Sequence, residues 1–212
     1  FKEKFFHVPL TEQPEYNGTQ LIHSKVIASY LRQLLRNDLQ YAPFRMEGME
    51  QDVREMMEID TPQGKLALQI GGTIDRLDSK GDTLRIVDYK TGGTPKTPEN
   101  IEQLFTPADN RPNYIFQTFL YAAILCRKQS LKVAPSLLYI HRAASESYSP
   151  VIEMGAPRQP KVPVNNFAFF EDEFRERLHG LLQEIFSQEE TFSQTEDTRK
   201  CEYCDFRSLC KR

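Results

Sequence analysis

The sequence predicts a mixed α/β domain in which a central β-sheet is flanked by α-helices. Two strands separated by a polar turn are expected within residues 66–90, where apolar and polar side chains alternate. A short apolar run at residues 136–140 predicts a further buried strand. Three stretches repeat apolar residues every three to four positions, as helices that pack on one face do. These stretches are residues 19–40, 113–128 and 170–187.

The first helix and the strand after it are bounded by turn-forming residues. The helical pattern of residues 19–40 ends before Pro43, because proline cannot continue a helix. Residues 50–59 are expected to form a strand. The turn at residues 61–64 then leads into the paired strands.

The paired strands at residues 66–90 carry a group of charged side chains. Side chains alternate along a strand, so Asp88 and Lys90 are expected on one face and Tyr89 on the other. Asp75 sits near the end of the first strand. The hairpin is therefore expected to bring two carboxylates and one ammonium group together at one edge of the sheet.

The second half of the chain is expected to alternate loops and helices around the buried strand. A proline-rich loop after the hairpin is expected to hold a short helix at residues 99–104. On the helix at residues 113–128, Gln117 and Tyr121 share a stripe, because residues four apart are neighbours on a helix. An edge strand is expected at residues 151–154.

Asp75, Asp88 and Lys90 have the composition of a hydrolytic metal site. Two nearby carboxylates repel each other unless a cation lies between them, and hard oxygen ligands suit Mg²⁺ or Mn²⁺. The backbone carbonyl of Tyr89 is a further candidate ligand. Such a cation polarises a phosphoryl oxygen, and Lys90 would orient or deprotonate the attacking water. The pattern indicates metal-assisted phosphodiester hydrolysis. The alternative is that Asp75 and Arg76 form a surface ion pair, which would contribute little.

Charge and hydropathy limit the classes of function. The 212 residues carry a formal net charge of −3, so any DNA-binding surface must be local or belong to a neighbouring domain. No apolar run approaches the ~20 residues of a membrane span, and the first residues do not resemble a signal peptide. We therefore expect a cytoplasmic protein that does not use a membrane. The first residue is not Met, and we expect a piece of a longer protein.

Three of the four cysteines crowd the C-terminal end in a C-x₂-C-x₅-C pattern: Cys201, Cys204 and Cys210. Thiolates at this spacing can bind a soft metal or an iron–sulfur cluster, either of which normally takes four protein ligands. The alternative is three free thiols on a terminal tail. The fourth cysteine, Cys126, lies in an apolar helix, where we expect a core residue.

Three motifs occur in order: Gly72-Thr73-Ile74-Asp75-Arg76, Ile86-Val87-Asp88-Tyr89-Lys90-Thr91-Gly92 and Gln117-x-x-x-Tyr121. Together they resemble the PD-(D/E)XK nuclease superfamily, and more narrowly its RecB-like branch, which includes the RecB, AddA and AddB helicase–nucleases and the Cas4 proteins. The resemblance implies a restriction-endonuclease-like core with a cysteine-containing C-terminal tail. It implies that Asp75 and Asp88 bind Mg²⁺ or Mn²⁺ and that Lys90 is catalytic. It also implies that Gln117, Tyr121 and Arg76 contact DNA, although a helix face packed near the sheet is an alternative role for Gln117 and Tyr121.

The resemblance also implies partners and a second cofactor. We expect the exonuclease module of a helicase–nuclease in DNA repair and recombination, with single-stranded DNA as substrate and a helicase domain or subunit as partner. The tail cysteines resemble part of the [4Fe-4S] site of AddB-type and Cas4-type nucleases, whose fourth cysteine lies far upstream. The family also places a metal-binding histidine on an early helix. His7 and His23 do not match that motif, so we expect this histidine and the fourth cysteine to precede Phe1.

One nuclease-type domain is expected over residues 1–212. It would comprise an N-terminal helix at residues 19–40, a catalytic core at residues 52–142, and a C-terminal helix with the cysteine-rich tail at residues 168–212. Two alternative functions remain open. One is a catalytically impaired nuclease fold that binds DNA or a partner subunit, and the other is a stand-alone Cas4-like exonuclease.

Overall fold

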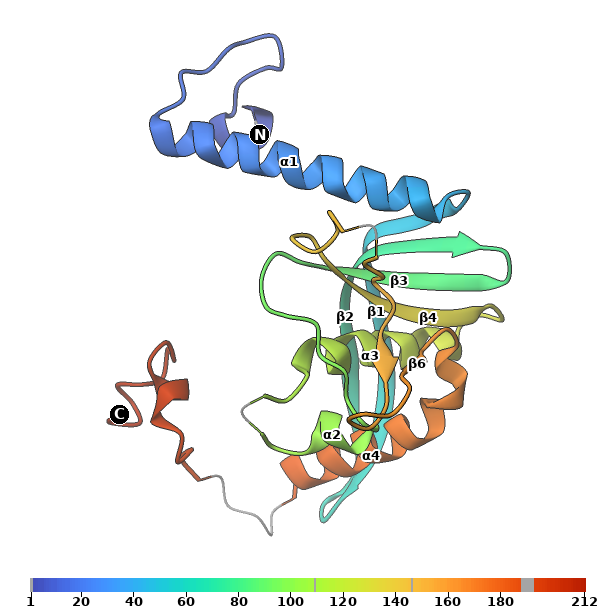
Figure 1. The fold of residues 1–212 in the computed structure, drawn as a ribbon. Helices are drawn as coiled ribbons and strands as arrows, with labels where there is room; N and C mark the ends of the chain where they lie inside the picture. Colours follow the sequence, from blue (N-terminus) through green and yellow to red (C-terminus); the bar gives the residue numbers. More distant parts are fainter. Residues whose placement is uncertain (1, 109, 146, 188–192) are drawn as a thin grey trace.

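The computed structural model describes residues 2–108, 110–145, 147–187 and 193–212, and it shows a β-sheet flanked by helices (Figure 1). The sheet has four strands in the order β1-β2-β3-β4. They are β1 (Arg45–Thr61), β2 (Gly64–Lys80), β3 (Thr83–Lys90) and β4 (Lys132–Tyr139). β1, β2 and β3 pair antiparallel, whereas β3 and β4 run parallel. The predicted mixed α/β architecture is thereby confirmed.

The main core lies on one face of the sheet, under three helices (Figure 1). Ile86 of β3, Phe119 of α3 and Phe174 of α4 are fully buried there. The rings of Phe119 and Phe174 meet edge to face, in a geometry that aromatic pairs prefer. The helices are α2 (Glu102–Phe105), α3 (Asn113–Cys126) and α4 (Glu171–Ile185).

The opposite face carries a smaller core that joins the sheet to α1 (Gly18–Tyr41). Tyr30 and Leu34 of α1 pack against a cluster that includes Val87 and Leu138. Val87 follows Ile86 directly, and alternation along the strand sends the two side chains into different cores. β3 is therefore buried on both faces, which fits its nearly continuous apolar sequence.

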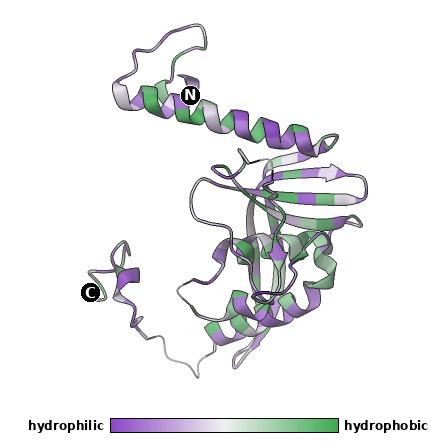
Figure 2. Cartoon of the chain, viewed as in Figure 1, coloured by the Kyte–Doolittle hydropathy of each residue, from purple (hydrophilic) through white to green (hydrophobic). Residues whose placement is uncertain are grey.

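α1 begins at a capping box and keeps part of its apolar surface exposed. Asn17 Oδ1 accepts a hydrogen bond from Gln20 N at 2.9 Å, and Gln20 Oε1 accepts one from Asn17 N at 3.0 Å. Apolar residues lie along much of the helix (Figure 2). Leu31, Leu35 and Leu39 remain more than half exposed, because only one side of α1 faces the sheet.

Several element boundaries differ from those that periodicity predicts. β1 begins at Arg45 rather than near residue 50, because Met46 and Gly48 pair with β2. A partner strand can thus extend a segment that has no clear pattern of its own. The expected edge strand is reduced to β5 (Glu153–Met154), which pairs with β6 (Val162–Pro163). Short helical turns lie at η1 (Lys2–Phe6), η2 (Phe167–Phe169) and η3 (Thr198–Cys201).

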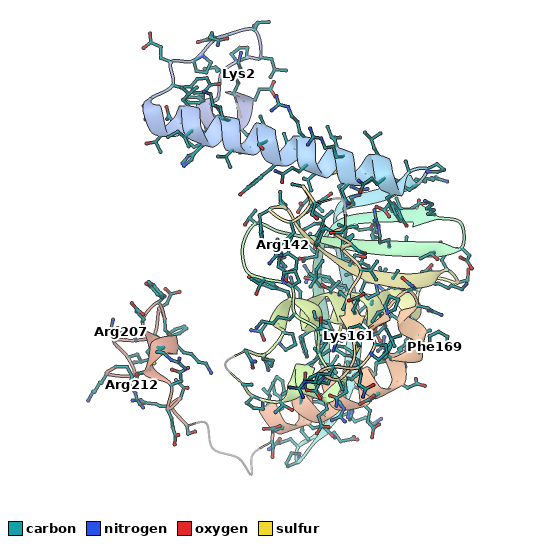
Figure 3. The ribbon with its side chains drawn as sticks, viewed as in Figure 1. Lys2, Arg142, Lys161, Phe169, Arg207 and Arg212 are labelled. Atoms are coloured by element: carbon teal, nitrogen blue, oxygen red, sulfur yellow. The ribbon has the colours of Figure 1, made fainter. Side chains whose placement is uncertain are left out.

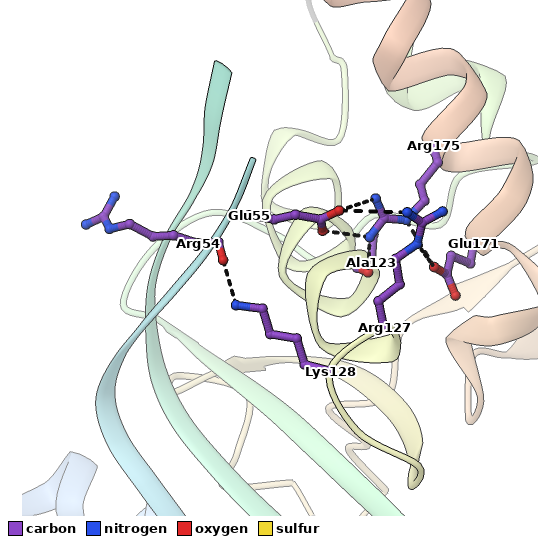
Figure 4. Close-up of polar contacts among 7 residues, drawn as sticks. All are labelled: Arg54, Glu55, Ala123, Arg127, Lys128, Glu171 and Arg175. Atoms are coloured by element: carbon purple, nitrogen blue, oxygen red, sulfur yellow. Dashed lines mark hydrogen bonds and ion pairs between the residues drawn. The ribbon is translucent and has the colours of Figure 1, made fainter. Parts of the chain in front are cut away.

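A buried arginine connects β1, α3 and α4 (Figure 4). Arg175 of α4 is 7% exposed, and its guanidinium donates to both carboxylate oxygens of Glu55 at 3.0 and 2.8 Å. It also donates to Glu171 Oε1 at 3.0 Å and to the carbonyl of Ala123 at 2.5 Å. One side chain therefore ties the long β1-β2 ribbon to both helices that cover it.

The C-terminal segment lies apart from the sheet and its helices (Figure 1). Arg207 and Arg212 are well separated from Arg142 and Lys161 of the main body (Figure 3). Within the segment, Arg212 Nε donates to Gln194 Oε1 at 3.1 Å. In the part of the chain that the structure describes, no helix has the length and apolar character needed to cross a membrane.

Candidate active site

Asp75 lies where β2 and β3 separate. The register between the two strands ends at the pair Arg76 and Val87, so Asp75 is the first residue of β2 beyond that pairing. Its Oδ2 accepts a hydrogen bond from the backbone N–H of Tyr89 at 2.8 Å. The Asp75 carboxylate thus takes the place of a β2 backbone carbonyl as the hydrogen-bond acceptor for Tyr89 N–H. This contact holds the carboxylate at the edge of β3, beside Asp88.

Asp88 and Lys90 lie on the same face of β3, as strand alternation predicts. Lys90 Nζ is 2.5 Å from Asp88 Oδ2 and donates to Gln117 Oε1 at 3.4 Å. It also lies over the ring of Tyr114, 4.2 Å from the centroid. The side chain of Lys90 is 14% exposed, so its ammonium group is held by three neighbours while remaining open to solvent.

Asp88 is a buried carboxylate in an unfavourable setting. The residue is 4% exposed, and burial raises the pKa of its carboxyl group. Lys90 acts against that shift, and the neighbouring charge of Asp75 adds to it. Asp88 Oδ2 is ion-paired with Lys90. Within the described residues it accepts no hydrogen bond of regular geometry. A buried acceptor of this kind has spare capacity for a cation.

Gln117 and Tyr121 lie one turn apart on α3 and are joined to each other. Gln117 Nε2 donates to the Tyr121 hydroxyl at 3.0 Å, while its carbonyl oxygen faces Lys90. Tyr121 is 5% exposed, and its hydroxyl packs against Gly72 of β2. The structure therefore places Gln117 at the site and Tyr121 behind it, where it supports Gln117.

Arg76 lies on the opposite face of the sheet. It is 3% exposed and donates to both carboxylate oxygens of Asp38 on α1, at 3.0 and 2.8 Å. It also donates to the Tyr89 hydroxyl at 3.1 Å and pairs with Asp78 at 2.9 Å. The predicted DNA contact does not fit this position, because alternation along β2 turns Arg76 into the interface with α1.

Tyr139 is a residue of the site that sequence reasoning missed. It pairs with Lys90 in the parallel register of β3 and β4, so the two side chains share one face. Tyr139 is 2% exposed, and burial raises the pKa of its phenol to about 12, with smaller contributions from the negative forms of Tyr148, Tyr114 and Asp88. Its place at the end of a buried strand was the available signal, but the strand register was needed to interpret it.

The residues present fit a small, hard divalent cation. Mg²⁺ is commonly bound through one or two carboxylates together with water and substrate phosphate, and Asp75 and Asp88 supply two carboxylates at one strand edge. The buried Oδ2 of Asp88 is a suitable ligand atom. Among the described residues, no group of three or more His, Cys, Asp or Glu side chains is gathered for a metal. The two carboxylates would therefore share the cation with backbone, solvent or substrate oxygens.

The N-terminal histidines and the C-terminal cysteines are not gathered with Asp75 and Asp88 in the described residues. His7 and His23 are exposed in the N-terminal part of the chain. Cys201, Cys204 and Cys210 carry free thiols and lie in the separate C-terminal segment. Cys126 packs against the main core, as expected, and burial raises the pKa of its thiol to about 11.

Comparison with known proteins agrees with this geometry. No curated protein matches the chain. The family model of the PD-(D/E)XK nuclease superfamily matches residues 2–211, nearly the whole chain. The match covers the sheet, the two aspartates and the lysine, as well as the C-terminal segment. The chain belongs to the PD-(D/E)XK nuclease superfamily.

Proposed function

We propose that this chain is a metal-dependent deoxyribonuclease domain in which Asp75, Asp88 and Lys90 carry out phosphodiester hydrolysis. One observation carries the proposal: the two carboxylates and the lysine converge at the strand edge where β2 leaves β3. Membership in a nuclease superfamily supports the class of reaction.

Each residue has a role that its contacts support. Asp75 and Asp88 would hold Mg²⁺ or Mn²⁺, with the backbone carbonyl of Tyr89 as a further ligand. A cation bound there supplies Lewis acidity toward the phosphoryl oxygen and lowers the pKa of a bound water. Lys90, held by Asp88 and Gln117, would donate a hydrogen bond to the phosphate or to the attacking water. Gln117 orients Lys90, and Tyr121 fixes Gln117.

We further propose that the domain works in the cytoplasm as the nuclease of a helicase–nuclease that processes DNA ends for repair and recombination. The order of the three motifs supports the RecB-like branch. The net charge of −3 favours a domain that receives single-stranded DNA from a motor over one that captures DNA by itself. The sequence contains no G-x-x-x-x-G-K-[ST] loop, so the motor would be another domain or subunit.

A second candidate is a nuclease fold with impaired catalysis that binds DNA or a partner subunit. The absence of a third His, Cys, Asp or Glu beside Asp75 and Asp88 among the described residues favours this alternative. The burial of Asp88 favours the enzyme, because the ion pair with Lys90 only partly offsets the cost of burying this carboxylate, and such a cost is rarely kept without a role.

An iron–sulfur cluster on Cys201, Cys204 and Cys210 is a separate proposal, supported only by their spacing. It requires a fourth ligand. Anaerobically purified protein should then absorb visible light near ~400 nm and contain iron. Protein that contains zinc alone, or no metal, would exclude the cluster.

Degradation of labelled single-stranded DNA in Mg²⁺ or Mn²⁺ tests the main proposal. Lys90→Ala should slow cleavage by ~10²-fold or more, the usual range for loss of a catalytic acid–base group. Lys65→Ala is the matched control, because Lys65 is 72% exposed and far from the site on the β1-β2 turn. If wild type and Lys90→Ala were equally inactive in both metals, the impaired module would be the better description.

A further inference from the structure

A cavity of about 330 Å³ lies directly beside the catalytic lysine. Tyr114 and Tyr139 line it, together with the loop that follows β3 and the turn that precedes α3. The ring of Tyr114 is also the ring beneath Lys90 Nζ. The cavity and the proposed hydrolytic centre therefore share a wall. Its volume is at the small end of the ~300–1,000 Å³ range of small-ligand sites.

Tyr139 lines the cavity with a mostly buried ring and with a hydroxyl that pairs with no side chain or backbone group among the described residues. The residue is 98% buried, and its hydroxyl makes no hydrogen bond within the described residues. The neighbouring Tyr148 differs, because its hydroxyl accepts from Tyr139 N and donates to the carbonyl of Leu137. The Tyr139 hydroxyl is not among the fully enclosed unpaired side-chain atoms of the described residues, so it remains open to solvent or to a ligand and is free to donate a hydrogen bond. The outer edge of the Tyr139 ring faces Gly93 across the cavity wall.

The cavity is basic. Lys96 and Arg111 line it, and none of its described lining residues is acidic. Arg111 Nε donates to Asn113 Oδ1 at 2.7 Å, which fixes the guanidinium at the wall. Lys96 Nζ donates to the carbonyl of Asn110 at 2.6 Å and more weakly to that of Arg111, and an ammonium group has three protons to donate. Both cations therefore remain available to an anion.

The cavity continues into two neighbours, which makes a path rather than an isolated pocket. A second cavity of about 460 Å³ shares Lys96, Arg111 and Pro112 with it. A third of about 240 Å³ shares Lys96 and Tyr139. Lys96 and Arg111 stand where the cavities of about 330 and 460 Å³ meet, whereas the cavity of about 240 Å³ also holds the acidic Glu153. An extended anionic chain is therefore expected to run through the first two cavities.

We propose that the cavity beside Lys90 binds one unpaired nucleotide of the DNA strand next to the bond that is cut. The Tyr139 hydroxyl donates a hydrogen bond to its phosphate, the Tyr114 ring stacks against its base, and Lys96 and Arg111 neutralise the adjoining phosphates. The inference rests on the proposed nuclease function and adds the subsite that selects single-stranded substrate. Stacking on Tyr114 requires a free base face, which a nucleotide inside a stacked duplex does not present.

The test measures binding separately from cleavage. Fluorescence anisotropy of a labelled octathymidylate, with Ca²⁺ in place of Mg²⁺, gives the Kd of wild type, Tyr139→Phe and Tyr114→Leu. Each variant should raise the Kd by about tenfold, the typical value of one hydrogen bond to a charged group or one base stack. Tyr203→Phe is the matched control, because Tyr203 is 90% exposed on the C-terminal segment. The same oligonucleotide annealed to its complement should bind more weakly than the single strand.

The outcomes separate the subsite from the nuclease assignment. If Tyr139→Phe and Tyr114→Leu bind the octathymidylate like wild type while wild type still cleaves DNA, the subsite is wrong and the nuclease stands. If both variants lose affinity but wild type cleaves nothing in Mn²⁺, the subsite stands and the nuclease is wrong. Equal affinity for the duplex, with the same loss in both variants, would overturn the selection of an unpaired nucleotide.

Discussion

At the scale of single residues, the proposed metal-binding role of Asp88 requires a buried carboxylate, and burying that carboxylate lowers the stability of the fold. Its carboxylate is buried, and burial raises its pKa despite the ion pair with Lys90. A carboxyl group whose pKa is higher in the folded state destabilises that state once the pH exceeds its pKa in the unfolded chain. The folded protein therefore loses stability as the pH rises from about 4 toward neutrality.

We predict that Asp88→Asn abolishes cleavage and yet raises the melting temperature of metal-free protein at neutral pH. The gain relative to wild type should grow between about pH 4 and pH 7, because only wild type must ionise a buried group in that interval. Differential scanning fluorimetry in EDTA across this range measures the difference. A gain that shrinks as the pH rises would mean that Lys90 more than compensates for burial.

Asp52→Asn is the matched control for that measurement. Asp52 is exposed, and its hydrogen bond from Thr73, at 2.7 Å, holds the pKa of its carboxyl group below the usual value. A lowered pKa contributes stability above the unfolded pKa, and this contribution is lost as the pH falls. Asp52→Asn should therefore show a small change of opposite sign to Asp88→Asn.

Sequence alone predicted which residues of the hairpin would lie together, but not all of their surroundings. Asp88 and Lys90 could be placed on one face because alternation along a strand is local. Arg76 was misjudged, because its partner Asp38 lies on a helix 38 residues earlier. Tyr139 was missed because only the register between β3 and β4 makes it a neighbour of Lys90. Contacts distant in sequence leave no periodic signal.

At the scale of elements, the approach of β2 to α3 depends on Gly72. A Cβ at this position would stand 2.6 Å from the Tyr121 hydroxyl and 3.1 Å from its Cε1. Tyr121 is buried and bonded to Gln117, so it has little freedom to withdraw. Strand β2 therefore needs glycine for close packing rather than for an unusual backbone angle.

Gly72→Ala should destabilise the fold by roughly 1–3 kcal/mol, the usual cost of overpacking a core, and should also slow cleavage by displacing Gln117. Gly180→Ala is the control: an added Cβ there meets open space within α4 and should stabilise by about 0.5–1 kcal/mol. Urea denaturation gives both values. A Gly72→Ala protein as stable as wild type would show that Tyr121 relaxes easily.

Arg175 and Arg127 provide a second comparison between elements. Both approach Glu55 and Glu171 (Figure 4), but the side chain of Arg175 is 8% exposed and that of Arg127 is 60% exposed. Arg175→Ala should cost about 3–5 kcal/mol, because it leaves two carboxylates without their buried partner. Arg127→Ala should cost less than about 1 kcal/mol. Equal losses in urea denaturation would contradict the assignment of Arg175 as the connection between β1 and α4.

The sequence predicted the helices at this scale better than the connections between them. α1, α3 and α4 follow clear helical periodicity, and all three were placed within a few residues. The role of Arg175 could not be predicted, because Glu55 is 120 residues away. The length of β1 was also underestimated, since pairing with β2 rather than its own residues extends it.

At the scale of the whole molecule, electrostatics should make DNA binding modest and only moderately dependent on salt. The net charge of −3 provides little general attraction for a polyanion. Three cations, Lys90, Lys96 and Arg111, lie at the site and the cavity beside it. For single strands, each neutralised phosphate contributes about 0.7 to the slope of log K against log salt.

We therefore predict a slope of about −2 for octathymidylate binding to wild type, measured by fluorescence anisotropy at fixed Ca²⁺. Removing one cation with Arg111→Gln should reduce its magnitude by somewhat less than one. A slope steeper than about −5 would point to an extended basic surface elsewhere on the molecule.

The central claim is that Asp75, Asp88 and Lys90 form one metal-dependent hydrolytic centre, and the Mn²⁺ dependence of single-stranded DNA cleavage tests it most directly. Asp75→Ala and Asp88→Ala should abolish cleavage or shift its half-maximal rate to much higher Mn²⁺. Lys90→Ala should lower the maximal rate while shifting the metal requirement little. Wild-type rates and wild-type Mn²⁺ dependence in all three variants would contradict the account.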